Sequence, residues 1–239
     1  MPTALVTGAT SGIGTAIALA LASAGYEVTA VGRNRDALAQ IGAQPFITGL
    51  CLDLTDRGRL HSAISGLDVD VLVNNAGIMP PLQNFCEAKL EDIDAAFAVN
   101  VTSAIELTRL VAPKMRRRGD GHIFFTGSIA GHSPFRNLAV YCATKAAIGG
   151  FAQALRLDLA ESGIRVTEIV AGRVETGLYN AIVSREAREA MYAGGTAVQP
   201  RDVGAMVLAI LGLPSSVDVS RFDILPVRQP TATEVSRKG

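Results

Sequence analysis

The segment Thr7-Gly-Ala-Thr-Ser-Gly-Ile-Gly14 separates two apolar runs of different periodicity. Residues 3–7 form a short apolar run typical of a buried strand. Residues 12–24 are rich in Ala and Leu and are followed by Gly25, as helices often are. We therefore predict that the chain begins with a strand, a glycine-rich turn and a helix.

This turn fits a phosphate-binding role. Glycines allow backbone N–H groups to approach a ligand closely, and the start of a helix adds partial positive charge. The spacing is Gly-x-x-x-Gly-x-Gly, which is neither the Gly-x-Gly-x-x-Gly dinucleotide fingerprint nor a P-loop, since no Lys-Ser/Thr follows. A tight turn without a ligand is the alternative, but the position on the first strand–helix unit favours a dinucleotide phosphate.

The end of the next predicted strand, residues 27–32, indicates which dinucleotide binds. NAD-binding folds carry an acidic residue at this place, where it contacts the ribose 2′-hydroxyl. Here Gly32 occupies it and Arg33 follows. A guanidinium pairs well with a 2′-phosphate, so we predict that NADP(H) is preferred over NAD(H). The alternative is that Arg33 only faces solvent.

Strands and helices alternate along the rest of the chain, which predicts a parallel sheet covered on both faces. Further strands are expected at residues 50–53, 69–73, 122–126, 165–170 and 222–225, with helices at 56–65, 91–118 and 202–211. We predict one α/β domain over residues 1–239, a Rossmann-type doubly wound fold with a seven-stranded parallel sheet. Residues 171–195 are interpreted as a substrate lid and residues 230–239 as a loose tail.

A candidate reaction centre lies between residues 128 and 145, after the predicted strand at 122–126. Tyr141 and Lys145 are four residues apart on a predicted helix and therefore share one face. A nearby ammonium lowers the pKa of a phenol from about 10, so we expect Tyr141 to exchange a proton near neutral pH. Ser128 is expected to hydrogen-bond the oxygen whose charge changes. Taken alone, the pair also fits a surface contact.

Two asparagine-containing segments complete the pattern. Asn74-Asn-Ala-Gly77 follows a buried strand and should lie at the carboxyl edge of the sheet, where ligands bind in such folds. Asn100 falls inside the predicted helix at 91–118, where Asn is a poor helix former. Asn100 therefore either has a functional role as a polar residue inside the helix or simply faces solvent.

Together these motifs resemble the short-chain dehydrogenase/reductases over nearly the whole chain. Within that family, the C-terminal region looks most like the NADP-dependent 3-hydroxy acid and serine dehydrogenases. The resemblance implies a catalytic set and a set of cofactor contacts. The catalytic set is Asn100, Ser128, Tyr141 and Lys145. The cofactor contacts are Gly8, Thr10, Ser11, Gly12, Ile13, Gly14, Arg33, Asn34, Asp53, Leu54, Asn74, Ala76, Gly77, Tyr141, Lys145, Gly172, Val174 and Thr176.

The implied reaction is hydride transfer between the nicotinamide and a carbonyl or alcohol carbon. Tyr141 would be the acid/base, Lys145 would hold the nicotinamide ribose, and Asn100 would position a relay water. The sequence departs from the family at Ala171-Gly172, where Pro-Gly is usual. This change loosens the backbone and is expected to alter how the nicotinamide carboxamide sits.

The substrate is less defined by the sequence. Besides Ser128 and Tyr141, we list Arg136, Arg173 and Tyr179 as substrate contacts. Either arginine would clamp a carboxylate or similar anion, such as a small hydroxy acid, or would face solvent. A reductase of a neutral ketone or aldehyde and a non-catalytic dinucleotide sensor are the alternative functions.

The composition of the chain limits which partners, cofactors and cellular compartments are expected. The net charge is zero and apolar residues make up 49% of the chain, which suits one large core and argues against nucleic-acid or membrane partners. Three isolated cysteines fit a reducing compartment, and three scattered histidines lack metal-ligand spacing. We expect a cytoplasmic enzyme without a metal. The family resemblance implies a homodimer or homotetramer.

Overall fold

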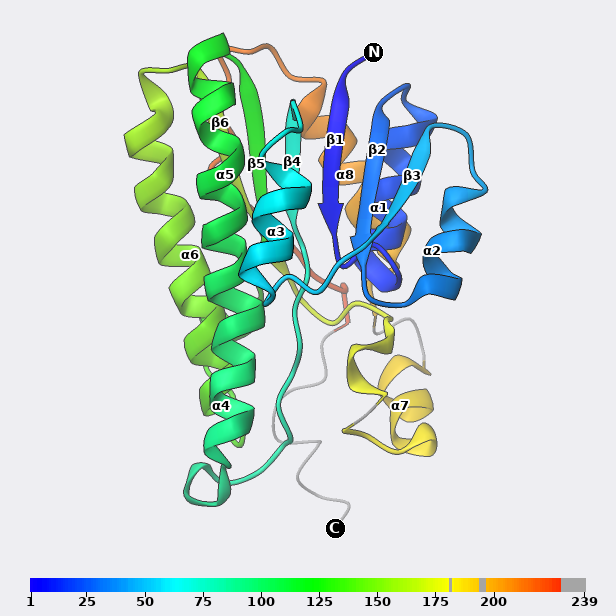
Figure 1. Ribbon diagram of the computed structural model, residues 1–239. Helices are drawn as coiled ribbons and strands as arrows, with labels where there is room; N and C mark the ends of the chain where they lie inside the picture. The colour runs from blue at the N-terminus through cyan, green and yellow to red at the C-terminus, as the bar shows by residue number, and fades with distance from the viewer. Residues whose placement is uncertain (181, 194–196, 229–239) are drawn as a thin grey trace.

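The computed structural model describes residues 1–180, 182–193 and 197–228 and contains a seven-stranded parallel sheet (Figure 1). The strand order is β3-β2-β1-β4-β5-β6-β7, as a Rossmann-type fold requires. The strands are β1 (Thr3–Thr7), β2 (Glu27–Gly32), β3 (Ile47–Cys51), β4 (Val71–Asn74), β5 (Gly121–Thr126), β6 (Ile164–Ala171) and β7 (Arg221–Ile224).

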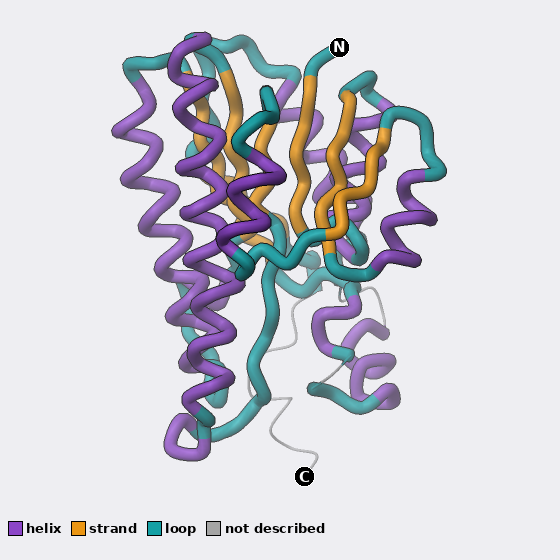
Figure 2. Tube along the Cα trace, viewed as in Figure 1, coloured by secondary structure: helices purple, strands orange, loops and turns teal. Residues whose placement is uncertain are grey.

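Helices cover both faces of the sheet (Figure 2). Helices α1 and α8 pack together on one face, with α2 beside β3. Helices α3, α5 and α6 cover the other face. The α-helices are α1 (Gly12–Ser23), α2 (Arg35–Gly42), α3 (Arg57–Ile64), α4 (Leu90–Phe97), α5 (Ser103–Arg118), α6 (Ala139–Ala160), α7 (Arg185–Tyr192) and α8 (Pro200–Leu211).

The central strands are buried on both faces, which explains their continuous apolar sequences. Every residue of β4 and of β5 is buried. Along β5, Phe124 belongs to the core beneath α1 and α8, while Phe125 belongs to the core beneath α3, α5 and α6. The alternation of side chains in a strand thus divides one apolar run between two cores.

The sheet has a switch point between β1 and β4. β1 pairs with β2 on one side and with β4 on the other. Strands β2 and β3 extend the sheet in one direction from β1, and strands β4 to β7 extend it in the opposite direction. In open parallel sheets, such a point leaves a crevice at the carboxyl ends of the strands, where ligands bind. The loops after the strands gather at this edge, toward α4 and α7 (Figure 1).

Most predicted elements are confirmed, but the strand predicted at 50–53 lies earlier, as β3 (Ile47–Cys51), and two helical features also differ. The sequence analysis did not anticipate α2, which is short and largely exposed. The helix predicted at 91–118 is not one regular α-helix, because a π-helical turn, η2 (Ala98–Thr102), separates α4 from α5. The predicted loose tail at 230–239 lies outside the described residues.

The continuous helical segment Leu90–Arg118 is the one candidate for a membrane span among the described residues, by length and composition alone. A core helix of a soluble protein passes the same test. Here Leu107, Val111 and Met115 of the segment lie in the core against the sheet. We therefore interpret it as a core helix.

His122 of β5 makes stability depend on acidity. Its Nε2 atom lies 2.7 Å from Oγ1 of Thr167, and burial lowers the pKa of His122 from 6.5 to about 3. The unfolded chain therefore binds a proton here below about pH 6.5 that the folded chain does not accept until about pH 3, so stability falls as pH drops through this window.

We expect His122→Leu to flatten this acid dependence by up to about 1.4 kcal/mol per pH unit. Urea unfolding between pH 7 and pH 4 measures the slope. A His122→Leu/Thr167→Val double variant controls for the hydroxyl left without its partner. Equal slopes in wild type and variants would show that another group dominates acid unfolding.

Candidate active site

A cavity of about 620 Å³ opens at the carboxyl edge of the sheet. This volume suits a cofactor-sized ligand. Its wall comes from the segments that follow β1 to β6 and from one face of α6. Residues predicted separately from sequence meet here: the glycine turn, Arg33, Ser128, Tyr141 and Lys145 all line the same cavity.

The glycine turn has a backbone that glycine alone adopts easily. Gly8 and Gly12 have φ angles of +64° and +54°. A Cβ atom on Gly14 would overlap the carbonyl oxygen of Gly8 and lie 2.6 Å from Nδ2 of Asn75. Ser11 is the N-cap of α1, but its side chain makes no capping hydrogen bond. The start of α1 therefore presents backbone N–H groups to the cavity, as phosphate binding requires.

Asn75 holds this turn in place, a role that the sequence analysis did not assign. Its Nδ2 atom donates to the carbonyl oxygen of Thr7 at 3.0 Å, and its Oδ1 atom accepts from the Thr126 hydroxyl at 3.2 Å. Asn75 thereby joins the carboxyl ends of β1, β4 and β5. Neighbouring Asn74 points elsewhere: its side chain is buried and donates to Thr108 of α5 at 3.0 Å.

Arg33 and Asp53, which follow β2 and β3, also line the cavity. Hydrogen bonds from the backbone and hydroxyl of Thr55 lower the pKa of Asp53, and Arg33 contributes less. Asp53 is thus ionised at neutral pH. Asn34 has a structural role, because its side chain caps α2 by accepting the N–H of Ala37 at 3.1 Å.

Three of the four predicted catalytic residues, Ser128, Tyr141 and Lys145, line the cavity together. Tyr141 and Lys145 are each 6% exposed, and Nζ of Lys145 lies 5.7 Å from the centre of the Tyr141 ring. The Lys145 ammonium donates to the carbonyl oxygen of Thr126 at 2.7 Å. Tyr141 is hydrogen-bonded to the side chain of Ser128. One face of α6 and the end of β5 thus bring together a hydroxyl, a phenol and an amine.

The prediction that the pKa of Tyr141 is lowered toward neutral is wrong for the cofactor-free chain. Burial raises the pKa of Tyr141, as does the nearby Tyr179, while the hydrogen bond to Ser128 opposes them. Burial also lowers the pKa of Lys145 to about 8, and Glu168 opposes that change. Tyr141 is therefore a protonated phenol at neutral pH, which suits a proton donor better than a base.

Asn100 is buried, which decides between its two predicted roles. It lies in the π-helical turn η2 and is 3% exposed. Its Oδ1 atom accepts from the N–H of Ile78 at 2.7 Å, and its Nδ2 atom donates to the Ile78 carbonyl oxygen and to Thr144 of α6. Asn100 thus connects the segment after β4 to the helix that carries Tyr141 and Lys145. Single π turns occur often at functional sites.

Comparison with known proteins agrees with this geometry. A profile described as short chain dehydrogenase matches residues 2–187, most of the chain. This chain belongs to the short-chain dehydrogenase/reductase family.

Three relatives of this short-chain dehydrogenase illustrate the similarity. An uncharacterized short-chain type dehydrogenase/reductase of Sinorhizobium fredii is 45% identical, over 95% of this chain and 92% of the relative. An NADP-dependent 3-hydroxy acid dehydrogenase of Salmonella typhi is 34% identical, over 95% and 96%. The closed form of a serine dehydrogenase complexed with NADP+ is 32% identical, with a TM-score of 0.91 over 96% of this chain and 97% of that one.

Not every predicted residue of the short-chain dehydrogenase lines the cavity. The cavity lining does not include Gly14, Asn34, Asn74 or Asn100, which have the packing and capping roles described above. The lining also contains apolar residues that no motif marked, including Ile78, Met79, Val99 and Leu178. Each of them lies close in the sequence to a residue of a predicted motif, and this proximity is the signal that could have identified them.

The two predicted arginine clamps are also outside the cavity wall. Arg173 donates to the carbonyl oxygen of Met191 at 3.0 Å and thereby holds α7 against the end of β6. Arg136 is exposed in the loop before α6. Tyr179, the third predicted substrate residue, does line the cavity.

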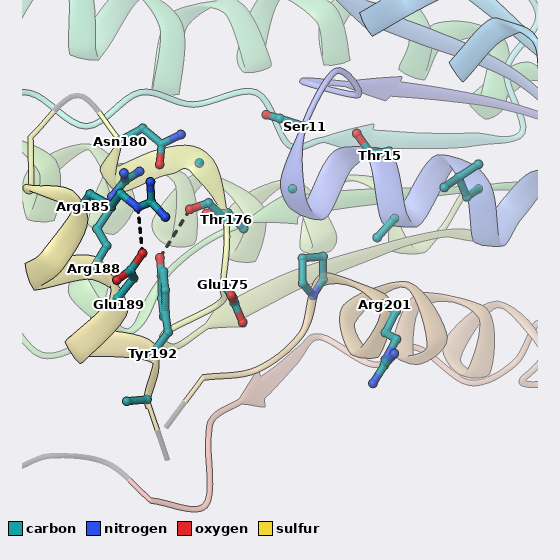
Figure 3. A pocket seen from close by; sticks show the side chains of 16 residues that line it. Ser11, Thr15, Glu175, Thr176, Asn180, Arg185, Arg188, Glu189, Tyr192 and Arg201 are labelled. Carbon is teal, nitrogen blue, oxygen red and sulfur yellow. Dashed lines mark hydrogen bonds and ion pairs between the residues drawn. The ribbon is translucent and has the colours of Figure 1, made fainter. Parts of the chain in front are cut away.

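A larger cavity of about 1010 Å³ lies between α1 and α7 (Figure 3). It contains none of the predicted catalytic residues, and it shares with the first cavity Ser11, Gly12, Thr176, Gly177 and Asn180. Arg185 pairs with Glu189 within α7, and the Tyr192 hydroxyl donates to the Thr176 carbonyl oxygen at 3.4 Å. The predicted catalytic residues Ser128, Tyr141 and Lys145 line only the smaller cavity of the two. The lid predicted at 171–195 stays a prediction, and residues 181, 194 and 195 lie outside the described residues.

Proposed function

We propose that this chain is an NADP(H)-dependent oxidoreductase that interconverts a carbonyl and an alcohol. The observation that carries the proposal is one cavity lined by the glycine turn, Arg33, Ser128, Tyr141 and Lys145. Family membership supports an oxidoreductase. The names of the relatives support the choice of NADP(H) over NAD(H).

The residues present fit this cofactor. The glycine turn leaves no room for Cβ atoms beside its backbone, as close approach of a diphosphate needs. Arg33 lines the cavity where a 2′-phosphate would lie, and no acidic residue directly follows β2. The bound nicotinamide would supply or accept the hydride.

The grouping of Ser128, Tyr141 and Lys145 in the cavity supports a division of roles. Tyr141, protonated at neutral pH, would donate its proton to the carbonyl oxygen during reduction. Ser128, its hydrogen-bond partner, would orient that oxygen. Lys145, held by the Thr126 carbonyl group, would stabilise the phenolate that remains after proton transfer. In the oxidative direction, Tyr141 must first lose its proton, so oxidation should require a higher pH than reduction.

Two substrate classes remain. The names of the relatives, a 3-hydroxy acid and a serine dehydrogenase, support a small hydroxy acid. A neutral ketone or aldehyde is the second candidate, because Ile78, Met79 and Leu178 line the cavity while Arg136 and Arg173 do not.

A substrate panel separates these candidates. Consumption of NADPH and NADH would be followed with aldehydes, ketones and oxo acids, and formation of reduced cofactor with serine and 3-hydroxy acids. We expect turnover with NADPH, and with NADP+ for at least one hydroxy acid. Preference for uncharged substrates would support the neutral class, and tight cofactor binding without turnover would favour a sensor.

Arg33 provides a test of cofactor choice. A charge-assisted hydrogen bond is worth about 1.5–3 kcal/mol, so Arg33→Ala should weaken NADPH binding about tenfold and leave NADH binding nearly unchanged. Cofactor fluorescence titration measures both dissociation constants. Arg35→Ala is the matched control, because Arg35 is exposed on α2 and does not line the cavity. Equal loss for both cofactors would remove Arg33 from the 2′-phosphate site.

The face of the molecule that carries α4 to α6 exposes large apolar side chains. Leu157 of α6 is 66% exposed, and Phe97 of α4 is 37% exposed, so the face that carries α4 to α6 offers apolar surface to a second copy. We propose a homodimer or homotetramer in the cytoplasm. Light scattering on the purified chain measures its mass, and a monomer would contradict this part of the proposal.

A further inference from the structure

Among the residues that the structure describes, Lys145 and Glu168 are the only Lys, Arg, Asp or Glu side chains in the buried class. Lys145 is 6% exposed and Glu168 is 1% exposed. They carry opposite charges and lie on α6 and β6, which pack against each other. Burying an ion without compensation is costly, so two buried ions of opposite sign on adjacent elements call for a common explanation.

The fold keeps a slot open for the Glu168 carboxylate. A Cβ atom on Gly127 would overlap Oε1 of Glu168, and one on Gly149 would lie 2.9 Å from the same atom. Gly127 directly precedes Ser128, and Gly149 follows Lys145 by one turn of α6. The carboxylate is therefore inserted between the two segments that carry the reactive groups.

His132 connects this carboxylate to solvent. Its Nε2 atom lies 3.0 Å from Oε1 of Glu168, and its side chain is 31% exposed. The second carboxylate oxygen, Oε2, is buried without a hydrogen-bond partner among the described residues. His132 follows η3 (Ile129–Gly131), whose last residue, Gly131, packs against the backbone of Lys145.

We propose that Glu168, held by His132, is the buried counter-charge that keeps Lys145 in its ammonium form and so sets the upper pH limit of turnover. The inference rests on the proposed function, in which Lys145 acts as a cation. Neither Glu168 nor His132 lines the reaction cavity, so both are positioning residues.

The charges around Lys145 give this proposal its direction. Burial lowers the pKa of Lys145 to about 8, close enough to neutral for the charge to be lost in mildly alkaline solution, and Glu168 opposes that loss. Glu168 is the charged group that acts on the Lys145 amine. The Tyr141 ring also lies 5.7 Å from Nζ of Lys145, but a protonated phenol carries no negative charge, which leaves Glu168 as the source of negative charge.

The main test is the pH dependence of kcat in Glu168→Gln. Glutamine keeps the size of the side chain but removes its charge, so the amine should deprotonate sooner. We expect the alkaline limb of the profile to move down by roughly one pH unit, while kcat below pH 7 changes little. Glu168→Asp retains the charge and should restore most of the wild-type limb. An unmoved limb in a folded Glu168→Gln variant would overturn the proposal.

A second readout works without turnover. Acetylation of Lys145 by a water-soluble acyl ester, quantified by mass spectrometry of the cofactor-free chain, reports the fraction of neutral amine at each pH. We expect the acetylation curve of Glu168→Gln to shift in the same direction as kcat. If wild type shows no turnover but this curve shifts, the proposed function fails and the counter-charge remains. If turnover is present but neither curve shifts, the role of Glu168 as counter-charge is refuted and the proposed function stands.

The role of His132 is tested by combining a His132 substitution with Glu168→Gln. Without His132, Oε1 of Glu168 would join Oε2 as a buried oxygen without a hydrogen-bond partner, and the carboxylate would no longer be held beside α6. His132→Leu should therefore move the alkaline limb in the same direction as Glu168→Gln. In the double variant we expect no further shift, because both changes act on the same carboxylate. Additive shifts would show that His132 acts independently of Glu168.

Discussion

Tyr141→Phe should lower kcat by about 10²–10⁴-fold, the usual contribution of a positioned general acid or base. Phenylalanine keeps the ring and its packing but removes the hydroxyl that would transfer the proton. Ser128 and Lys145 would remain in the cavity, but the proposed proton donor would be absent. Because Tyr141 is one of about thirty lining residues, NADPH binding should change by less than about threefold.

Steady-state kinetics and a cofactor titration together check this expectation. Tyr26→Phe is the matched control, since Tyr26 is a partly buried tyrosine packed against the core and is not part of the cavity wall. The control should retain wild-type kcat. Near-normal turnover of Tyr141→Phe would exclude the phenol as the proton donor. A parallel loss of cofactor affinity would indicate a collapsed cavity instead of lost chemistry.

Gly14→Ala should damage both the fold and the cofactor site. The new Cβ would overlap the carbonyl oxygen of Gly8, so α1 must move away from the turn. Such overpacking costs about 1–3 kcal/mol and should lower Tm by roughly 2–10 °C. The same movement displaces the N–H groups at the start of α1. Losing one or two hydrogen bonds to a charged phosphate should weaken NADPH binding about a hundredfold.

Gly58→Ala is the control for this prediction. Gly58 lies in the first turn of α3, and its new Cβ would lie 3.7 Å from Oδ1 of Asp56, an ordinary contact. Alanine is the better helix former, so stability should stay constant or rise by about 0.5–1 kcal/mol with no change in NADPH affinity. Thermal unfolding and fluorescence titration measure both quantities. Similar behaviour of the two variants would mean that Gly14 is not packed as described.

The sheet could be predicted because its strands have a strong local signal. β4 and β5 are buried on both faces, so their sequences are almost continuously apolar. Helix α2 gave little signal, since its eight residues bury only Leu38 and Ile41. The π turn at Ala98–Thr102 could not be predicted either, because a continuous helix and a helix with one widened turn have nearly the same composition.

The residues of the candidate site likewise differ in how well the sequence predicted them. Residues that belong to motifs, such as Ser128, Tyr141 and Lys145, meet in one cavity as the sequence indicated. Arg173 has an equally suggestive position in the sequence, but its guanidinium is used to hold the backbone of Met191. The protonation of Tyr141 was mispredicted for a related reason. Spacing along a helix gives proximity to Lys145, but it does not give the degree of burial, which dominates both pKa values.

The widened turn at Ala98–Thr102 has a geometric consequence for the whole helical rod. Each residue of an α-helix advances the direction of its side chain by about 100°, so one surplus residue rotates everything downstream by that amount. The helical segment can therefore direct the Asn100 amide to Ile78 and Thr144 and still present Leu107, Val111 and Met115 to the sheet. Deleting one residue from this turn would convert it to a regular α-helical turn. Either the Asn100 amide or the apolar side chains of α5 would then point in the wrong direction.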